Sequence, residues 1–334
     1  MNSITTPQYS PATPWSGRDD GDGIEHQRWH NLVKPLDLSH NDAEIPKQSI
    51  AILGFASDEG VARNAGRQGA AKGPEAIRAS LGSLAVHPGE LPDDIFDAGT
   101  IATEGDNLES AHTQLIQTVQ RISAENLVFV LGGGHETAYG SHLGLQASQK
   151  FPVKIINLDA HFDLRTSNIP TSGTPFRQIA DHYLNIQDQG SNFSFDYSVL
   201  GISRANNTKI LFDTADELGV EYVLDDELLN VSPHEIHGLV ERLISGSPTS
   251  LIHLSIDLDV LPASTAPGVS APAALGVPLT TIRAIAVEIA KSGRLALVDI
   301  VELNPKFDVD SRTAKTAARL INDLAIAHHA AIKA

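Results

Sequence analysis

The chain has 334 residues, no cysteine and a formal charge of −17, from 41 acidic and 24 basic residues. Without cysteine there is no disulfide, thiolate metal site or cysteine nucleophile, so any metal must be held by His, Asp and Glu. The negative charge argues against nucleic-acid and membrane-surface partners. No apolar run approaches the roughly 20 residues that span a bilayer, and no secretory signal pattern is present, so we expect a soluble cytoplasmic protein.

Residues 1–45 are polar and lack sustained periodicity, and we expect them to form an arm that packs on the body. From residue 46 to 334, apolar strands alternate with amphipathic helices in a single catalytic domain. This alternation predicts a parallel sheet covered by helices on both faces. The expected strands lie within residues 48–55, 94–100, 126–134, 154–160, 198–203, 220–225, 251–259 and 295–303. The expected helices lie within 73–84, 107–125, 208–219, 232–245 and 280–293.

Polar residues gather where four of these strands end. Ligands of open parallel sheets bind beyond the carboxyl ends of the strands. Residues at i, i+2 and i+4 of an extended segment project to one side, so the polar residues of 159–163 face a common point, and those of 257–259 repeat the pattern. The residues concerned are His135, Asp159, His161, Asp163, Asp257, Asp259 and Glu302.

The four aspartates and two histidines of this set have the chemistry of a metal site. Converging carboxylates repel one another and are costly to bury unpaired, and divalent cations relieve that repulsion. Six ligands exceed what one tetrahedral zinc takes, whereas two ions that share bridging carboxylates suit the set. Oxygen and nitrogen ligands without sulfur fit manganese best, with zinc, cobalt or iron also possible.

Each motif taken alone has a simpler interpretation. The Asp-Leu-Asp of 257–259 is common in sugar transferases and is often merely solvated. The glycine-rich stretch 132–136 could be a tight turn, and 159–163 could be a satisfied polar turn. The glycine stretch does not fit the dinucleotide pattern GxGxxG, because Thr137 occupies the position of the last glycine. Three such motifs, each at a strand end, favour the metal site.

GGGHE (132–136), NLDAHFDLR (157–165) and SIDLDVLPASTAPGVSAP (255–272) resemble, in order and spacing, the three metal-binding signatures of the arginase/agmatinase (ureohydrolase) family. The resemblance extends from about residue 50 to the C-terminus. It implies a three-layer α/β/α sandwich around an eight-stranded parallel sheet, two Mn²⁺ per subunit and a homo-oligomer. By motif position, one manganese would bind His135, Asp159, Asp163 and Asp257, and the other Asp159, His161, Asp257 and Asp259.

Further segments (15–21, 54–78, 172–178 and 201–208) resemble the branch that hydrolyses N-formimidoyl-L-glutamate to L-glutamate and formamide in histidine degradation. Substrate chemistry agrees. Arginases meet the free amine of arginine with an acid that residues 201–207 lack, and they carry Asn where this chain has Arg165. A small amidine dicarboxylate suits a site rich in arginine. The residues that we expect to bind the carboxylates of the substrate are Arg165, Ser172, Thr174, Arg204 and Asn206.

The resemblance also implies a mechanism. A metal-bridging hydroxide attacks the amidine carbon, Glu302 orients the amidinium by charge-assisted hydrogen bonds, and Asp163 passes a proton to the departing nitrogen. The proton-shuttling His of arginases is replaced by Phe176, which argues against arginase activity. Two alternatives stay open: another ureohydrolase, such as an agmatinase or guanidino-acid hydrolase, and a non-catalytic metabolite-binding relative.

Overall fold

The structure is a computed structural model, and it describes residues 8–40, 42–247 and 250–334. Within these residues, ten strands form one sheet in the order β1-β4-β3-β5-β10-β9-β6-β7-β8, with β2 paired to β4. Strands β3 to β10 all run parallel to their neighbours among these eight. The strands are β1 (Gln8–Ser10), β2 (Val33–Pro35), β3 (Ile50–Ala56), β4 (Ile95–Ala102), β5 (Leu127–Leu131), β6 (Val153–Leu158), β7 (Tyr197–Ile202), β8 (Glu221–Leu224), β9 (Leu251–Asp257) and β10 (Leu295–Val301).

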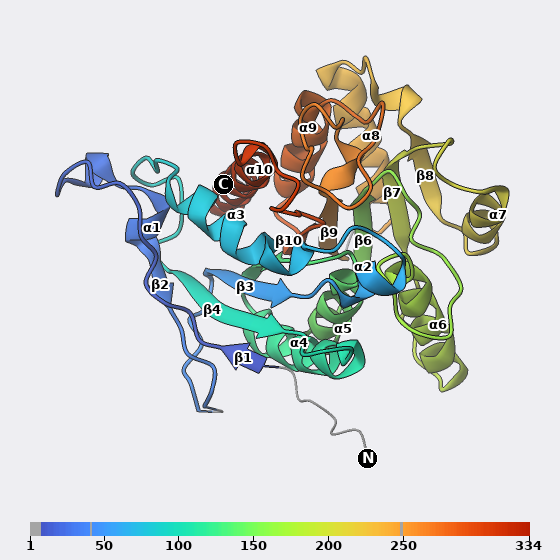
Figure 1. The fold of residues 1–334 in the computed structure, drawn as a ribbon, viewed down its shortest axis with the longest axis horizontal. Helices are drawn as coiled ribbons and strands as arrows, with labels where there is room; N and C mark the ends of the chain where they lie inside the picture. Colours follow the sequence, from blue (N-terminus) through green and yellow to red (C-terminus); the bar gives the residue numbers. More distant parts are fainter. Residues whose placement is uncertain (1–7, 41, 248–249) are drawn as a thin grey trace.

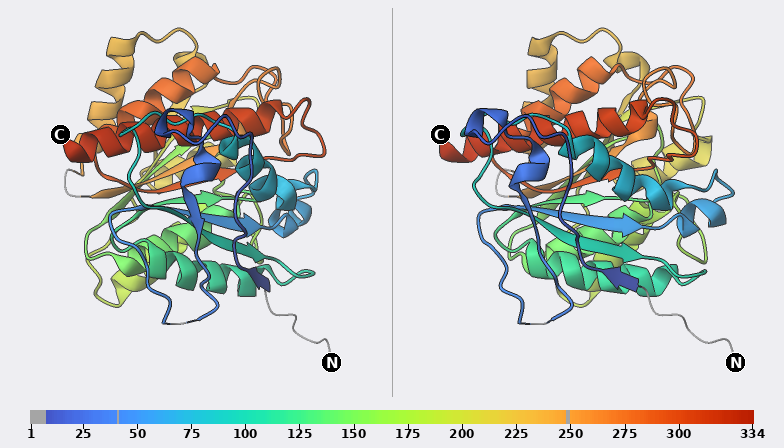
Figure 2. Two further views of the ribbon diagram at one scale, coloured as in Figure 1. Left: turned by 90° about the vertical axis from the view of Figure 1, so that its left-hand side faces the viewer. Right: turned by 60° about the vertical axis from the view of Figure 1, so that its left-hand side comes forward.

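Helices cover both faces of the sheet, which gives three layers (Figures 1 and 2). Helices α3, α8, α9 and α10 pack on one face, and α4, α5 and α6 pack on the other. The α-helices of the described chain are α1 (Trp29–Leu32), α2 (Glu59–Arg63), α3 (Gly73–Gly82), α4 (Leu108–Ile122), α5 (Thr137–Ser148), α6 (Pro175–Asp188), α7 (Lys209–Glu217), α8 (Pro233–Ser245), α9 (Leu279–Ala290) and α10 (Arg312–Lys333).

The predicted sandwich with a parallel sheet is confirmed, and all eight predicted strands are present. The sheet has two more strands than predicted, because the N-terminal segment supplies both. β1 pairs antiparallel and β2 pairs parallel with β4, where they occupy hydrogen-bonding groups that an edge strand would otherwise expose. Each is three residues long, which is too short for an alternating pattern to be visible in the sequence.

Two tryptophans anchor the same N-terminal segment to the rest of the chain by hydrogen bonds of their indole N–H groups. The indole of Trp15 donates to Asp97 Oδ2 at 2.8 Å, and that of Trp29 donates to Asn322 Oδ1 at 2.8 Å. Trp29 is fully buried. The division into an arm (1–45) and a catalytic domain (46–334) stays a prediction.

Sequence pattern explains why these helices form and which side they bury. In α4 the buried apolar residues recur every three or four positions, at Leu108, Ala111, Leu115, Val119 and Ile122, which places them on one face. Helix α8 begins with a capping box, in which the Ser232 hydroxyl accepts from Glu235 N and the Glu235 carboxylate accepts from Ser232 N. Among the described residues, no helix is long and apolar enough to cross a membrane.

Alternation along β9 divides its side chains between the two helical layers. Ile252, Leu254 and Ile256 pack with the helices of the α9 and α10 face. His253 and Ser255 point to the other side, toward His142 of α5 and toward His135. Asp257, at the carboxyl end of the strand, follows Ser255 by two residues and lies on the same side as His253 and Ser255. The candidate functional site begins there.

Candidate metal centre and substrate cavity

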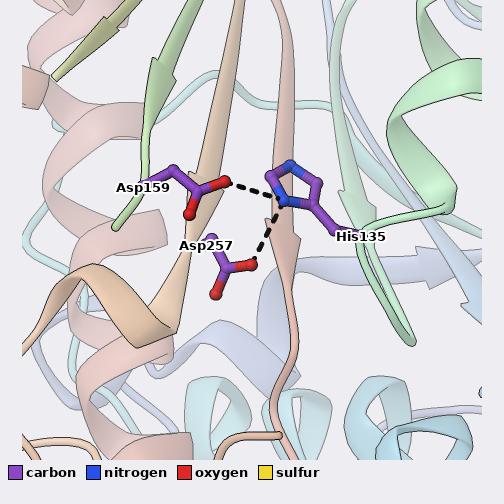
Figure 3. Close-up of side chains that lie close together, drawn as sticks. All are labelled: His135, Asp159 and Asp257. Carbon is purple, nitrogen blue, oxygen red and sulfur yellow. Dashed lines mark ion pairs between the residues drawn. The ribbon is translucent and has the colours of Figure 1, made fainter. Parts of the chain in front are cut away.

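The candidate metal ligands follow three strands in the middle of the sheet, β5, β9 and β6, and Glu302 follows β10, which lies between β5 and β9. Strands β5, β10, β9 and β6 are adjacent in that order. Because they are parallel, their carboxyl ends meet at one edge. Figure 3 shows His135, Asp159 and Asp257 converging from the ends of β5, β6 and β9. The loops after β6 and β9 bring the other ligands to the same place, namely His161, Asp163 and Asp259.

Carboxylate oxygens lie close to both imidazoles of this cluster. The Nδ1 atom of His135 lies 3.1 Å from Asp159 Oδ2 and 3.1 Å from Asp257 Oδ2, and 3.0 Å from Asp163 Oδ2. The Nδ1 atom of His161 lies 3.1 Å from Asp259 Oδ2. The described residues thus offer two overlapping ligand groups that share Asp159.

The donor set fits divalent cations. One imidazole N–H donates to one carboxylate at best, yet three carboxylate oxygens face His135 Nδ1. Burial, together with the charges of Asp259 and Asp159, raises the pKa of Asp257 well above its usual value. Burial opposes protonation of His135, but its contacts with Asp159, Asp163 and Asp257 raise its pKa well above the usual value. A bound cation relieves both perturbations.

Neighbouring groups hold the ligands in orientation. Asp159 Oδ1 accepts from His161 N at 2.7 Å, and Asp257 Oδ1 accepts from Asp259 N at 2.8 Å. Each aspartate therefore keeps its second oxygen turned toward His135. The Nε2 atom of His135 is 3.0 Å from Ser255 Oγ, which leaves Nδ1 for the centre of the cluster.

Backbone strain marks two residues of the site. Asp163 has φ 50° and Glu302 has φ 68°, a left-handed region that non-glycine residues rarely adopt. Glu302 Oε1 accepts from His135 N at 2.8 Å, while its Oε2 is buried and has no hydrogen-bond partner among the described residues. Burial, with the charge of Glu136, raises the pKa of Glu302 to about 8. A cationic substrate group would satisfy this carboxylate.

A cavity of about 190 Å³ opens over the cluster, and it receives some of the predicted substrate ligands but not others. Arg165, Ser172 and Glu302, three of the residues predicted to contact the substrate, line it. Residues that sequence reasoning did not single out also line it: Asn64, Gly66, Asn207, Leu211, Ser270 and Ala271. Within the described chain, Arg165 has no carboxylate in an ion pair with it, so its guanidinium is available to a substrate anion.

Thr174, Arg204 and Asn206, which were also predicted to bind the substrate carboxylates, are not among the residues that line this cavity. The Thr174 hydroxyl is buried and donates within its own turn, to Thr171 O at 3.0 Å. Arg204 is exposed, with its guanidinium 5.8 Å from the centre of the Phe212 ring. After β7 it is Asn207, not the exposed Asn206, that turns inward, and its Oδ1 accepts from Phe162 N.

Phe176, which stands where arginases carry a proton-shuttling His, is part of the core. It is fully buried, stacks on Tyr197 at 4.4 Å between ring centres and meets the His135 ring edge-on at 5.2 Å. The side chain packs behind the metal centre and offers no group that transfers a proton.

Acid should destabilise the fold through His112, which lies behind the site. Its Nε2 is 2.9 Å from Glu136 O, and burial lowers the pKa of His112 to about 4. Between pH 6.5 and 4 the unfolded chain binds a proton that the folded chain does not. The free energy of unfolding therefore decreases as the pH is lowered from 6.5 to 4, by about 3 kcal/mol in total. In chelator-treated protein, chemical unfolding should show a shallower pH slope for His112→Gln than for the wild type. Equal slopes would contradict the assignment.

A three-layer α/β fold that gathers four aspartates and two histidines at the carboxyl ends of its central strands defines an α/β protein with a candidate site for divalent metal ions. The chain belongs to the arginase family, whose sequence model matches residues 48–327. It is 49% identical over 317 residues to the formimidoylglutamase of Rhodococcus jostii (strain RHA1), covering 93% of this chain and 94% of that one.

Solved structures show the same fold. The formimidoylglutamase of Bacillus subtilis superposes with a TM-score of 0.77 at 21% identity, covering 93% of this chain and 96% of that one. The Trypanosoma cruzi formiminoglutamase, solved with Mn²⁺, superposes with a TM-score of 0.70 at 26% identity, covering 84% and 94%. The family resemblance expected from the three motifs is thereby confirmed.

Proposed function

We propose that this chain is a binuclear manganese hydrolase that converts N-formimidoyl-L-glutamate and water to L-glutamate and formamide. The observation that carries the proposal is the convergence of three carboxylates on one imidazole nitrogen below a cavity whose lining includes Arg165. The names of relatives that match nearly the whole chain at close to half identity support the same substrate. A homo-oligomer in the cytoplasm is part of the proposal.

In this proposal one Mn²⁺ binds His135, Asp159, Asp163 and Asp257, and the other binds Asp159, His161, Asp257 and Asp259. The assignment of four residues to each ion follows the order of the motifs. The close approach of His135, Asp159, Asp163 and Asp257 supports the first set, and that of Asp159, His161 and Asp259 supports three residues of the second. The chemistry that two bound divalent ions supply is a nucleophilic water at neutral pH.

The chain's own residues bind and orient the substrate. Glu302 accepts hydrogen bonds from the amidinium through Oε2, the oxygen that has no partner among the described residues. Arg165 and the Ser172 hydroxyl contact a carboxylate at the far side of the cavity. Asp163 lies 3.0 Å from His135 Nδ1 at the cavity wall, where it can pass a proton to the departing nitrogen.

A substrate panel tests the proposal. Manganese-loaded protein should release formamide from N-formimidoyl-L-glutamate and show little urea release from arginine, agmatine or guanidinobutyrate. Agmatine is cationic at its far end, where Arg165 would repel it. Preferential urea release from agmatine or guanidinobutyrate would assign the chain to another ureohydrolase. Tight substrate binding without turnover of any compound would indicate a metabolite-binding relative.

A further inference from the structure

Helix α2 joins the metal centre to the segment that carries the candidate carboxylate ligands. We call residues 165–174 the substrate loop. On the metal side, Glu136, which follows the ligand His135, accepts from Gly60 N of α2 at 3.0 Å. On the other side, Gly60 O accepts from Ser172 N at 3.0 Å. The substrate loop is thus docked against α2 by a backbone hydrogen bond.

A partly buried arginine strengthens this docking. Arg63, the last residue of α2, pairs with Glu59 at 2.8 Å and with Glu109 of α4 at 2.7 Å. The same guanidinium donates to Asp106 O at 2.6 Å and to Pro170 O of the substrate loop at 3.2 Å. Because only 12% of its side chain is exposed, Arg63 acts as a fixed anchor, and the residue after it has a defined position.

That next residue is Asn64, which caps α2 and lines the cavity. Its Nδ2 donates to Ser172 Oγ at 3.1 Å. Since the hydroxyl accepts this bond, its own hydrogen stays free to donate into the cavity. Ser172 is buried and its Oγ has no other hydrogen-bond partner among the described residues. Asn64 therefore sets the direction of a donor that faces the substrate.

The glycine beside Ser172 keeps Asn64 and Arg165 close together. A Cβ atom on Gly173 would lie 2.9 Å from Arg165 Cδ and 3.2 Å from Asn64 Nδ2. The absence of a side chain lets both residues lie against the loop backbone, where Gly173 O also accepts from Arg165 N at 3.0 Å. An amide, a hydroxyl and a guanidinium thus stand side by side, all able to donate.

We propose that Asn64 is a specificity-determining residue, which orients the Ser172 hydroxyl as a hydrogen-bond donor to one carboxylate of the substrate; this rests on the function proposed above. Asn64 acts through Ser172 and is a positioning residue. An amide suits this role, because a carboxylate at the same place would accept the Ser172 hydrogen and repel the substrate anion.

The near-isosteric change Asn64→Asp tests this role. It preserves the size of the side chain, and the new negative charge at the C-terminus of α2 destabilises the helix only slightly, so a purely structural residue should tolerate it. We expect kcat/KM for N-formimidoyl-L-glutamate to fall about a hundredfold, mostly through KM, and to fall only about tenfold in Asn64→Ala. Asn192→Asp, an exposed position before β7, adds the same charge away from the cavity and should be neutral. Melting temperature and manganese content of each variant confirm that the fold and the metal centre are intact.

Truncated substrates separate positioning from a general loss of activity. The N-formimidoyl derivatives of 4-aminobutyrate and L-2-aminobutyrate lack the α- and the γ-carboxylate of the natural skeleton, respectively. The penalty of Asn64→Asp should largely disappear with the derivative that lacks the carboxylate bound by Ser172. In a protein that already carries Ser172→Ala, the further substitution Asn64→Ala should have little additional effect on kcat/KM.

Equal penalties on all three substrates, or an Asn64→Asp variant as active as the wild type, would overturn the role of Asn64 while leaving the proposed function intact. No turnover of N-formimidoyl-L-glutamate by the wild type would overturn both.

Discussion

Asp257→Asn should stabilise the metal-free protein and abolish its activity at the same time. Burial and the nearby charges of Asp259 and Asp159 raise the pKa of Asp257 well above its usual value, so the ionised carboxylate lowers metal-free stability at neutral pH. A neutral amide removes that repulsion. It also removes a ligand that the proposed function assigns to both metal ions, and we expect kcat to fall about a thousandfold or more. The melting temperature with and without manganese, alongside turnover, measures both effects.

Manganese should raise the melting temperature of the wild type by mass action, and this rise should be absent or much smaller in Asp257→Asn. Asp97→Asn is the matched control. Asp97 is also buried, but it pairs with Arg78 at 2.7 Å, so its neutralisation should destabilise the protein. Two results would contradict the two-metal assignment. One is a metal-free Asp257→Asn variant that melts at a lower temperature than the metal-free wild type, and the other is full activity of Asp257→Asn in the presence of manganese.

Arg165→Ala should raise KM for N-formimidoyl-L-glutamate roughly tenfold to a hundredfold, with a smaller effect on kcat. The guanidinium lines the cavity and has no carboxylate in an ion pair with it among the described residues. Its loss therefore removes one charge-assisted hydrogen bond to the substrate without freeing a buried partner. Steady-state kinetics and metal content, measured on the same preparation, separate binding from loss of manganese.

Arg177→Ala provides the control for removal of a surface arginine. Arg177 pairs with Asp181 along α6 at 3.0 Å, away from the cavity lining, and its loss should leave KM unchanged. Arg165→Lys keeps the charge but not the planar fork, and should fall between Arg165→Ala and the wild type. An unchanged KM in Arg165→Ala would show that the substrate carboxylates bind elsewhere.

The sequence was sufficient to predict the metal cluster because strand geometry determines it. Asp159 and Asp257 stand at the ends of apolar strands that the sheet places side by side. His161 and Asp259 follow in the loops beyond the strand ends, Asp259 within the 3-10 turn Leu258–Val260, and their backbone N–H groups donate to Asp159 and Asp257. The His161 Nδ1 atom lies 3.6 Å from Asp159 Oδ1 and 3.1 Å from Asp259 Oδ2. The strand ends and their parallel pairing are visible in the residues, whereas the turns that direct His161 and Asp259 are not extended and form only in the folded chain.

The substrate cavity was less predictable because loops without periodicity build it. Nothing in the stretch 201–208 indicates that Asn207 turns inward while Arg204 and Asn206 stay exposed. Asn64 lies about a hundred residues from Ser172 in the sequence, and only tertiary packing brings them together. The left-handed conformation of Glu302 is equally invisible, because non-glycine residues adopt it under tertiary constraint.

Formamide release during a manganese titration tests the central claim most directly. Chelator-treated protein should be inactive on N-formimidoyl-L-glutamate. Activity should rise with added manganese and reach a plateau at two bound ions per chain, with formamide and glutamate formed in equal amounts. A plateau at one ion, full turnover in metal-free protein, or two bound ions without formamide release would contradict the account.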